Sequence, residues 1–140
     1  MRFAWASVFV VLCASSGAAD QGMLAAVNPE RAANGRSALV YDTRLEAAAR
    51  AHGLDMAQAG FFDHTGSDGS DIGDRLGRVG YPFCFGAENI AAGQRSLKAV
   101  MQAWMGSRGH RGNILHRKAE AVGVARVQGN RSVMVLAAGC

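Results

Sequence analysis

The clearest periodicity along the chain is helical and runs from Asp42 or Thr43 to Ala59, where several alanines favour a helix. Thr43 and Glu46 fit a capping box at its start, and Gly60 follows its end as a stop signal. Hydrophobic and small residues recur on one side of this helix. They are Leu45, Ala48, Ala49, His52, Met56 and Ala59.

Three further segments also favour helices. The first covers Met23–Asn34, and Pro29 should end or kink it, because proline lacks an amide donor. A short helix is expected over Asp71–Val79, and a stronger one over Leu97–Ser107 with Ser96 as its N-cap. The side chains that the stronger helix should bury are Leu97, Val100, Met101, Trp104 and Met105.

The β-type segments lie mainly in the second half of the chain. Residues 83–91 favour an extended strand, and Gly129-Asn130 joins the runs Ala121–Val127 and Ser132–Ala138. A Gly-Asn connection predicts a hairpin, because both positions tolerate positive φ. We expect Gly109–Leu115 to form a compact turn. About four helical pieces and a small antiparallel sheet predict an α+β fold, with helices covering both faces of the sheet.

The N-terminal residues have the pattern of an export signal. A short basic start is followed by the uncharged run Phe3–Cys13 and by small residues up to Ala19. The run is shorter than the roughly 20 apolar residues that a membrane span needs. We therefore expect residues 1–19 to be a cleaved signal peptide and residues 20–140 to form one domain. The protein should then be secreted, extracellular or periplasmic, with no membrane span.

The charged residues add little to this prediction of an exported single-domain protein. The 15 Lys and Arg residues outnumber the 11 Asp and Glu residues, which gives a net charge of +4. The basic residues are scattered, without the aromatic or glycine pattern of nucleic-acid-binding proteins, so we interpret them as solvated surface and expect no nucleic-acid partner. Weak attraction to an anionic cell surface stays open. The basic residues that support this interpretation include Arg31, Arg36, Arg44, Arg50, Arg75, Arg78, Arg95, Arg108 and Arg111.

Two cysteines, Cys84 and Cys140, remain after the predicted signal peptide. In an oxidising compartment an isolated pair most simply forms a disulfide. Closing so long a loop would stabilise the fold by about 4 kcal/mol in the chain-entropy description. The alternative is a reactive thiol or a thiolate metal ligand, but neither cysteine lies in a CxxC motif or beside a histidine.

The candidate chemistry centres on His64, Glu88 and His110. His64 opens a polar, glycine-rich loop, and His110 follows Gly109 where the chain must turn. Glu88 lies between small residues and an isoleucine, so its carboxylate should have a buried partner. Two imidazoles and one carboxylate suit a divalent ion such as zinc, or an acid–base group. A hydrogen-bonded network that only ties loops together explains them equally well.

The remaining polar residues favour simpler interpretations. His52 lies on the hydrophobic side of a predicted helix and should pack in the core, whereas His116 lies beside Arg117 and Lys118 and should be exposed. The aspartates of residues 63–74 do not follow the spacing of a calcium loop. No GxSxG motif occurs, so a serine hydrolase is unsupported.

Several short motifs occur in one order along the chain. They are FFDHTGSDG at residues 61–69, ENIAxG at residues 88–93 and WMxSxGHRxNIL at residues 104–115. Together they resemble the CAP superfamily (cysteine-rich secretory proteins, antigen 5 and pathogenesis-related group one), in its bacterial SCP-domain branch. The resemblance implies an α-β-α sandwich with a ligand cleft.

The resemblance also assigns the residues of that cleft. His64 matches the first family histidine, Glu88 the first glutamate and His110 the second histidine. The second glutamate should lie one helical turn after the tryptophan, where this chain has Ser107. Asn113 and Ser107 would belong to the ligand cleft, and the histidines, with Glu88 as a further candidate, could hold a metal such as zinc.

Three functions follow from the resemblance. The first is a non-catalytic secreted binding or signalling module whose partner is a small ligand, a lipid or a cell-surface component. The second is a metal-dependent hydrolase of extracellular peptides or cell-wall material, and the third is a lipid or sterol carrier. The missing second glutamate and the absence of an identifiable nucleophile favour the first, a non-enzyme, and we expect a monomer.

Overall fold

A computed structural model describes residues 17–140 of the chain. The predicted signal peptide, residues 1–19, therefore lies almost wholly outside the described residues. Within them the helices are α1 (Gly17–Ala33), α2 (Thr43–Ala59), α3 (Ile72–Arg78), α4 (Leu97–Met105) and α5 (Arg108–Ile114). The strands are β1 (Val40–Tyr41), β2 (Phe83–Ala92), β3 (Ala121–Val127) and β4 (Arg131–Gly139).

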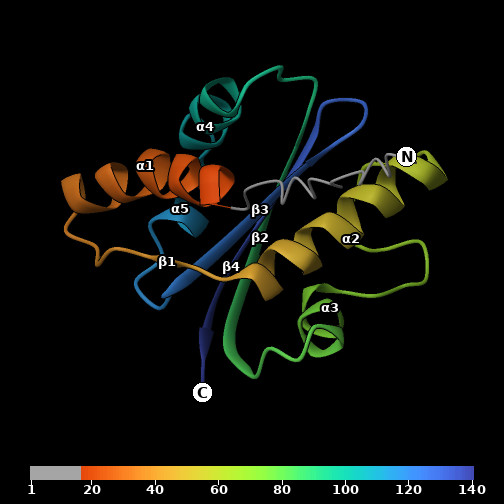
Figure 1. The fold of residues 1–140 in the computed structure, drawn as a ribbon, viewed down its shortest axis with the longest axis horizontal. Helices are drawn as coiled ribbons and strands as arrows, with labels where there is room; N and C mark the ends of the chain where they lie inside the picture. Colours follow the sequence, from red (N-terminus) through yellow and green to blue (C-terminus); the bar gives the residue numbers. More distant parts are fainter. Residues whose placement is uncertain (1–16) are drawn as a thin grey trace, which may run out of the picture.

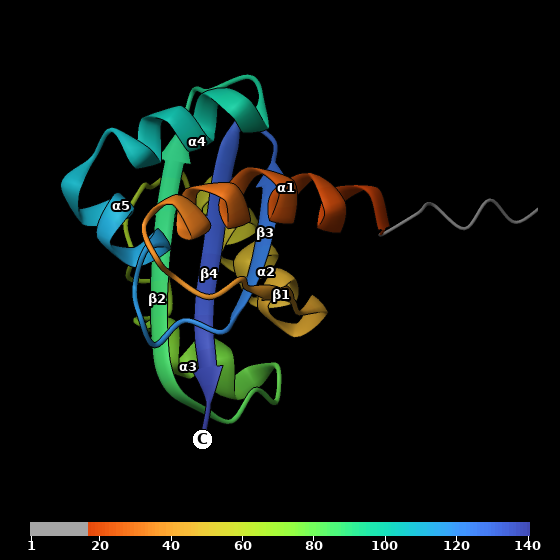
Figure 2. The ribbon, with the colours of Figure 1, turned by 90° about the vertical axis from the view of Figure 1, so that its left-hand side faces the viewer.

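The four strands form one sheet in the order β1-β3-β4-β2. Helices α2 and α3 cover one face, and α1, α4 and α5 cover the other (Figures 1 and 2). The predicted α-β-α sandwich is thus confirmed. The sheet is mixed rather than purely antiparallel, because β1 pairs with β3 in parallel while β3 and β2 flank β4 in antiparallel register.

Alternation along the central strands separates two hydrophobic cores. Val122, Val124, Met134 and Leu136 face α1, α4 and α5. Their neighbours in the strands face α2 and α3. The residues from β3 and β4 in this second core are Ala121, Ala125, Val133, Val135 and Ala137. Strand β4 is buried on both faces, which explains its nearly continuous hydrophobic sequence.

The predicted hairpin and α2 agree with the structure, apart from the N-cap of α2. Gly129 and Asn130 have φ of 74° and 49°, as the hairpin requires, and Gly60 ends α2 with a φ of 73°. The predicted capping box is wrong, since Asp42 rather than Thr43 is the N-cap and accepts from the Arg44 amide at 2.8 Å. An aspartate one residue earlier can reach the same free amides.

The turn expected at 109–115 is wrong, and Pro29 does not end α1. The expected turn at 109–115 is the helix α5, although two glycines disfavour a helix there. Helix α1 continues through Pro29, which lies on its exposed side. Val27 and Arg31, on either side of this proline, are fully buried. Contacts with the sheet and with neighbouring segments therefore override local propensity in both helices.

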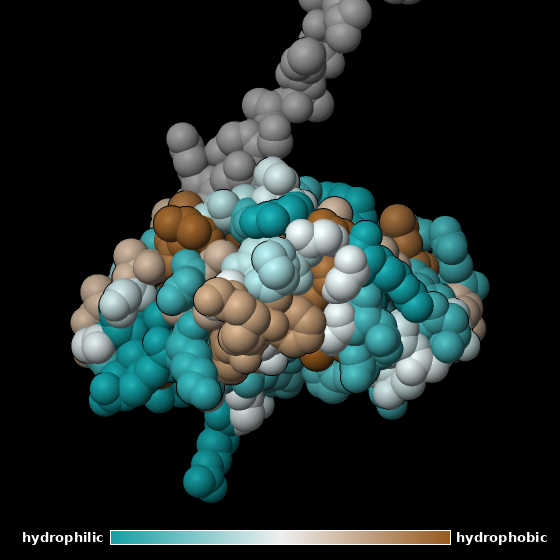
Figure 3. Space-filling view, turned by 90° about the horizontal axis from the view of Figure 1, so that it is seen from below, coloured by the Kyte–Doolittle hydropathy of each residue, from teal (hydrophilic) through white to brown (hydrophobic). Residues whose placement is uncertain are grey.

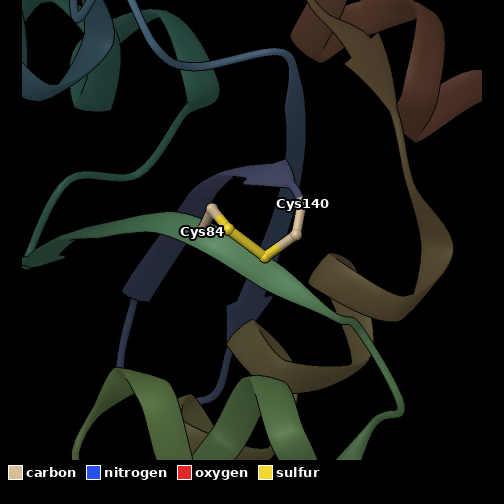
Figure 4. Close-up of a disulfide and its surroundings, with 2 residues drawn as sticks. All are labelled: Cys84 and Cys140. Carbon is tan, nitrogen blue, oxygen red and sulfur yellow. A yellow bond between two sulfur atoms is a disulfide. The ribbon is translucent and has the colours of Figure 1, made fainter.

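The Cys84–Cys140 disulfide is present (Figure 4). It joins the start of β2 to the residue that follows β4. The Cys140 amide also donates to the carbonyl of Pro82 at 3.3 Å. The bond therefore ties the ends of two strands that the antiparallel pairing of β2 and β4 already places side by side.

Arg31 contradicts the prediction that the basic residues are solvated. It is 0% exposed, and its guanidinium donates to four main-chain carbonyls. Burial, and then the positive charge of Arg36, lowers the pKa of Arg31 below its ordinary value. The contacts join the end of α1 to the turn after α5. The acceptors are the carbonyl oxygens of Ser37, Ile114, His116 and Ala119, at 2.7 to 3.2 Å.

The surface carries few large hydrophobic side chains. Among residues 17–140 the exposed ones are Val40, Phe62 and Phe83. The face seen from below in Figure 1 is mainly hydrophilic, with small hydrophobic patches between the polar residues (Figure 3). No helix in this part of the chain is both long and apolar enough to cross a bilayer.

Gly123 of β3 lies where α2 crosses the sheet. An added Cβ would overlap the backbone of Leu45 and Glu46 in α2. We predict that Gly123→Ala lowers the free energy of unfolding in urea by about 3 kcal/mol, the upper range for overpacking, because backbone must move. Gly77→Ala in α3, where an added Cβ meets nothing within 4 Å, is the control. It should be neutral or stabilising, and equal losses in both variants would contradict the close approach.

Candidate functional site

The candidate site is built on β2, an edge strand whose side chains alternate between the two faces of the sheet. Glu88 and Ile90 face α2 and α3, and Ile90 belongs to the core on that side. Asn89 faces α5, where its amide donates to the carbonyl of His110 at 3.1 Å. Adjacent residues of one strand therefore reach the two helical layers.

The carboxylate of Glu88 is almost completely buried, with a side chain 3% exposed. Its Oε2 accepts from Arg75 Nη2 at 2.9 Å, and its Oε1 accepts from His64 Nδ1 at 2.9 Å. His52 Nε2 lies 3.7 Å from Oε1, too far for a hydrogen bond. The prediction that Glu88 has a buried partner is confirmed.

Arg75 is the residue of this cluster that the sequence interpretation missed. It was placed among the solvated cations, but its side chain is 4% exposed. The guanidinium also donates to the carbonyls of Ser70 and His64, each at 3.0 Å. Helix α3 presents it, and Asp71 caps that helix in a capping box with Asp74. The sequence indicated only that the Glu88 carboxylate needs a buried partner, and several arginines could have been that partner.

The two histidines on this side of the sheet differ in exposure. His64 is 59% exposed, and because a carboxylate can only accept, its Nδ1 carries the proton and its Nε2 is left to solvent. His52 is buried, as predicted, and its Nε2 donates to the carbonyl of Asp63 at 2.8 Å. His64 therefore offers a free nitrogen, whereas His52 supports the loop that carries His64.

On the other side of β2, polar side chains close the free edge of the sheet. Asn113 donates to Asn89 Oδ1 at 2.8 Å and to the carbonyl of Glu88 at 3.3 Å. Trp104 Nε1 donates to the carbonyl of Ile90 at 3.2 Å. These bonds satisfy carbonyls that an edge strand would otherwise leave open, and they hold α4 and α5 against β2.

His64 and Glu88 touch, and with Arg75 they line a hollow of about 280 Å³ that Thr65, Asp71 and Ile72 complete. His110 lies in the layer of α5 and is half-buried. Burial, and then the positive charge of His64, lowers the pKa of His110, so the two imidazoles are within electrostatic range.

Ser107 is the N-cap of α5 without a side-chain capping bond, and within residues 17–140 no hydrogen bond joins it to His64 or Glu88. Asn113 acts on the main chain of β2 rather than in the hollow. His116, predicted to be exposed, is half-buried and stacks on Phe85 with ring centroids 4.2 Å apart.

The donor set does not fit a three-ligand metal centre. Both oxygens of Glu88 are engaged by protein donors. Within residues 17–140 no three His, Cys, Asp or Glu side chains gather closely enough to hold an ion. Binding of a divalent ion by His64 and His110 alone stays a prediction.

The sequence and the fold both have counterparts in known proteins. A sequence model described as the cysteine-rich secretory protein family, CAP, matches residues 24–137. The chain belongs to the CAP family. The uncharacterised Bacillus subtilis protein YkwD is 34% identical over 114 residues, which are 81% of this chain and 44% of that protein.

Two solved structures show the same fold. An extracellular Bacillus anthracis protein containing an SCP domain matches with a TM-score of 0.80 at 28% identity, over 86% of this chain and 40% of that one. An outer surface protein of Borrelia burgdorferi, 18% identical, also has a TM-score of 0.80 over 90% of this chain and 96% of that one. This CAP chain thus spans less than half the length of both Bacillus relatives.

We predict that Arg75→Met lowers the free energy of unfolding by about 3–5 kcal/mol, because it leaves the Glu88 carboxylate buried without its cation. Arg78→Met, in the same helix, removes an exposed ion pair with Asp68 and should cost at most about 1 kcal/mol. Urea unfolding compares the two. Adding Glu88→Met to Arg75→Met should restore part of the loss, and similar costs for the two single variants would contradict the role of Arg75.

We predict an NMR titration midpoint for His110 below its ordinary value of 6.5. His64→Gln should raise that midpoint part of the way, since burial is the larger cause, while His116→Gln should leave it unchanged. The shift also makes unfolding easier as the pH falls from 6.5 toward the lowered midpoint, because the unfolded chain takes up the proton first. An unchanged midpoint in His64→Gln would show that the two imidazoles do not interact.

Proposed function

We propose that this CAP protein is an extracellular binding or signalling module. In this proposal the hollow beside His64 and Glu88 holds a small ligand, or the two histidines hold a divalent ion, without turnover. Two observations support a location of this protein outside the cytoplasm. One is the Cys84–Cys140 disulfide, and the other is the similarity to a Bacillus anthracis protein that is described as extracellular. The predicted signal peptide would supply the route.

The main support for the proposal is that both carboxylate oxygens of Glu88 are already hydrogen-bonded within the protein. A general base must offer a lone pair to the proton that it removes and must reach the substrate. Both oxygens of Glu88 already accept hydrogen bonds, and its side chain is 3% exposed. Ser107 supplies no second carboxylate at the family position. These observations favour a carboxylate that positions His64 over one that transfers protons.

The groups that remain available suit a polar ligand. His64 Nε2 can accept a hydrogen bond, and Thr65 and Asp71 add a hydroxyl and a carboxylate to the lining of the hollow. Because Glu88 orients the imidazole through Nδ1, the direction of Nε2 is fixed before a ligand arrives. Such preorganisation lowers the entropic cost of binding.

A second candidate function is lipid or sterol binding. Helices α1 and α4 enclose a groove of about 440 Å³ on the other side of the sheet. Small and hydrophobic residues supply most of its lining, as an acyl chain or a sterol would require. They are Gly22, Ala25, Ala26, Leu97, Met101 and Met105.

We predict no hydrolysis of peptide or peptidoglycan-fragment panels above the buffer rate, for the oxidised protein or for Glu88→Gln, with and without Zn²⁺. In a Zn²⁺ titration followed by NMR, the imidazole signals of His64 and His110 should shift in the parent, and the His110 shift should be lost in His64→Gln. Turnover by the folded parent that Glu88→Gln abolishes would contradict the proposal. Saturable capture of a labelled fatty acid or sterol, without a change at His64, would favour the second candidate.

A further inference from the structure

The longest stretch without acidic residues after the predicted signal peptide ends in a turn beside α5. No Asp or Glu occurs between Glu88 and Glu120, while six Lys or Arg residues do. Four of the six lie on α5 or in the turn that follows it, at Arg108, Arg111, Arg117 and Lys118. The cations of this stretch are therefore concentrated at α5 and the turn after it, which the net charge of the whole chain does not reveal.

The fold brings a fifth cation to the same place from the far end of α1. Arg36 Nε donates to the carbonyl of Leu115 at 2.8 Å, and Arg111 donates to Asn34 Oδ1 at 3.2 Å. The segment after α1 therefore runs beside α5 (Figure 2). Within residues 17–140 no carboxylate forms an ion pair with Arg36, Arg108, Arg111, Arg117 or Lys118.

A buried charge strengthens this positive region from beneath. The Arg31 guanidinium donates to the carbonyls of Ile114 and His116, and within residues 17–140 no ion pair includes it. The charge of Arg36 contributes to the lowered pKa of Arg31, so like charges are close here. The combined field of these like charges favours an external anion.

The surface between these cations is hollowed. Two hollows of about 480 and 510 Å³ share Gly112 and Leu115, so they adjoin along α5. We call them together the basic trough. The first hollow includes Arg108 and Arg111, and the second includes Arg36, Arg117 and Lys118. Met105, Leu115 and the bare backbone of Gly112 supply uncharged surface between them.

We propose that the basic trough binds an acidic polysaccharide, with the hydrocarbon faces of successive sugar rings on the uncharged surface and their carboxylates paired with the surrounding arginines. Guanidinium groups bind carboxylates through two parallel hydrogen bonds, which gives such pairs both strength and orientation. The site lies on α5 and is separate from the hollow of His64 and Glu88, so this inference does not depend on the proposed function.

Two other polyanions fit the trough less well. Single-stranded nucleic acid binds by stacking bases on free aromatic rings. The one ring system in the trough, His116, is already stacked on Phe85. A membrane surface calls for protruding hydrophobic side chains, and the exposed ones among residues 17–140, Val40, Phe62 and Phe83, lie outside the trough.

A negative charge introduced into the trough tests the proposal without disturbing the fold. An added Cβ at Gly112 meets nothing within 4 Å, so Gly112→Glu should fold and place a negative charge between the cations. Gly77→Glu is the matched control, because Gly77 has the same open surroundings on α3, on the opposite face of the sheet. Both variants change the net charge equally, and circular dichroism verifies that both fold.

The probe is a size-fractionated galacturonate oligomer, titrated calorimetrically into the oxidised full chain at low salt. We expect saturable binding that weakens as salt rises. Gly112→Glu should raise the Kd about tenfold, which is the loss expected when several exposed ion pairs are weakened together. Gly77→Glu should raise the Kd less than about twofold. Absence of binding, equal losses in the two variants or equal binding of a neutral maltose oligomer would overturn the proposal. So would tighter, Gly112→Glu-sensitive binding of single-stranded DNA or of anionic phospholipid vesicles.

Discussion

The ion pair between Glu88 and Arg75 is the interaction on which the site depends. Removing a carboxylate and a guanidinium from water is costly, and good geometry with further hydrogen bonds must offset that cost. Here the guanidinium also bonds the carbonyls of Ser70 and His64, and the carboxylate also bonds the His64 imidazole. One buried pair therefore fixes α3 against β2, shapes the loop before α3 and sets the direction of an exposed histidine.

Strand β2 extends the influence of this pair to the opposite helical layer. Because side chains alternate, Glu88 faces α2 and α3, while Asn89 faces α5 and donates to the carbonyl of His110. Asn113 of α5 in turn donates to the main-chain carbonyl of Glu88. A shift of this strand by one residue would exchange the two faces and break both sets of contacts. The disulfide at its start and the nine-residue pairing with β4 both oppose such a shift.

Local signals in the sequence predicted the parts of the fold that depend on neighbouring residues. The hairpin at Gly129-Asn130 and the end of α2 at Gly60 agree with the structure. The disulfide and the existence of a buried partner for Glu88 also agree, but they were expected from the cysteine count and from the cost of an unpaired buried charge. Sequence spacing did not reveal which cation is that partner, because burial of an arginine is decided by tertiary contacts. Arg31 is similar, since three of its four acceptors lie 83 to 88 residues away. Helix α5 likewise depends on packing rather than propensity.

The buried Arg31 has a consequence for how this surface can vary. Its four acceptors are all main-chain oxygens, so the contact does not depend on which side chains occupy positions 37, 114, 116 and 119. Substitutions in the turn after α5 can therefore change its charge and shape while α1 stays attached through the same bonds. Such a turn can evolve new binding properties, because its substitutions leave the hydrogen bonds between Arg31 and the main chain in place.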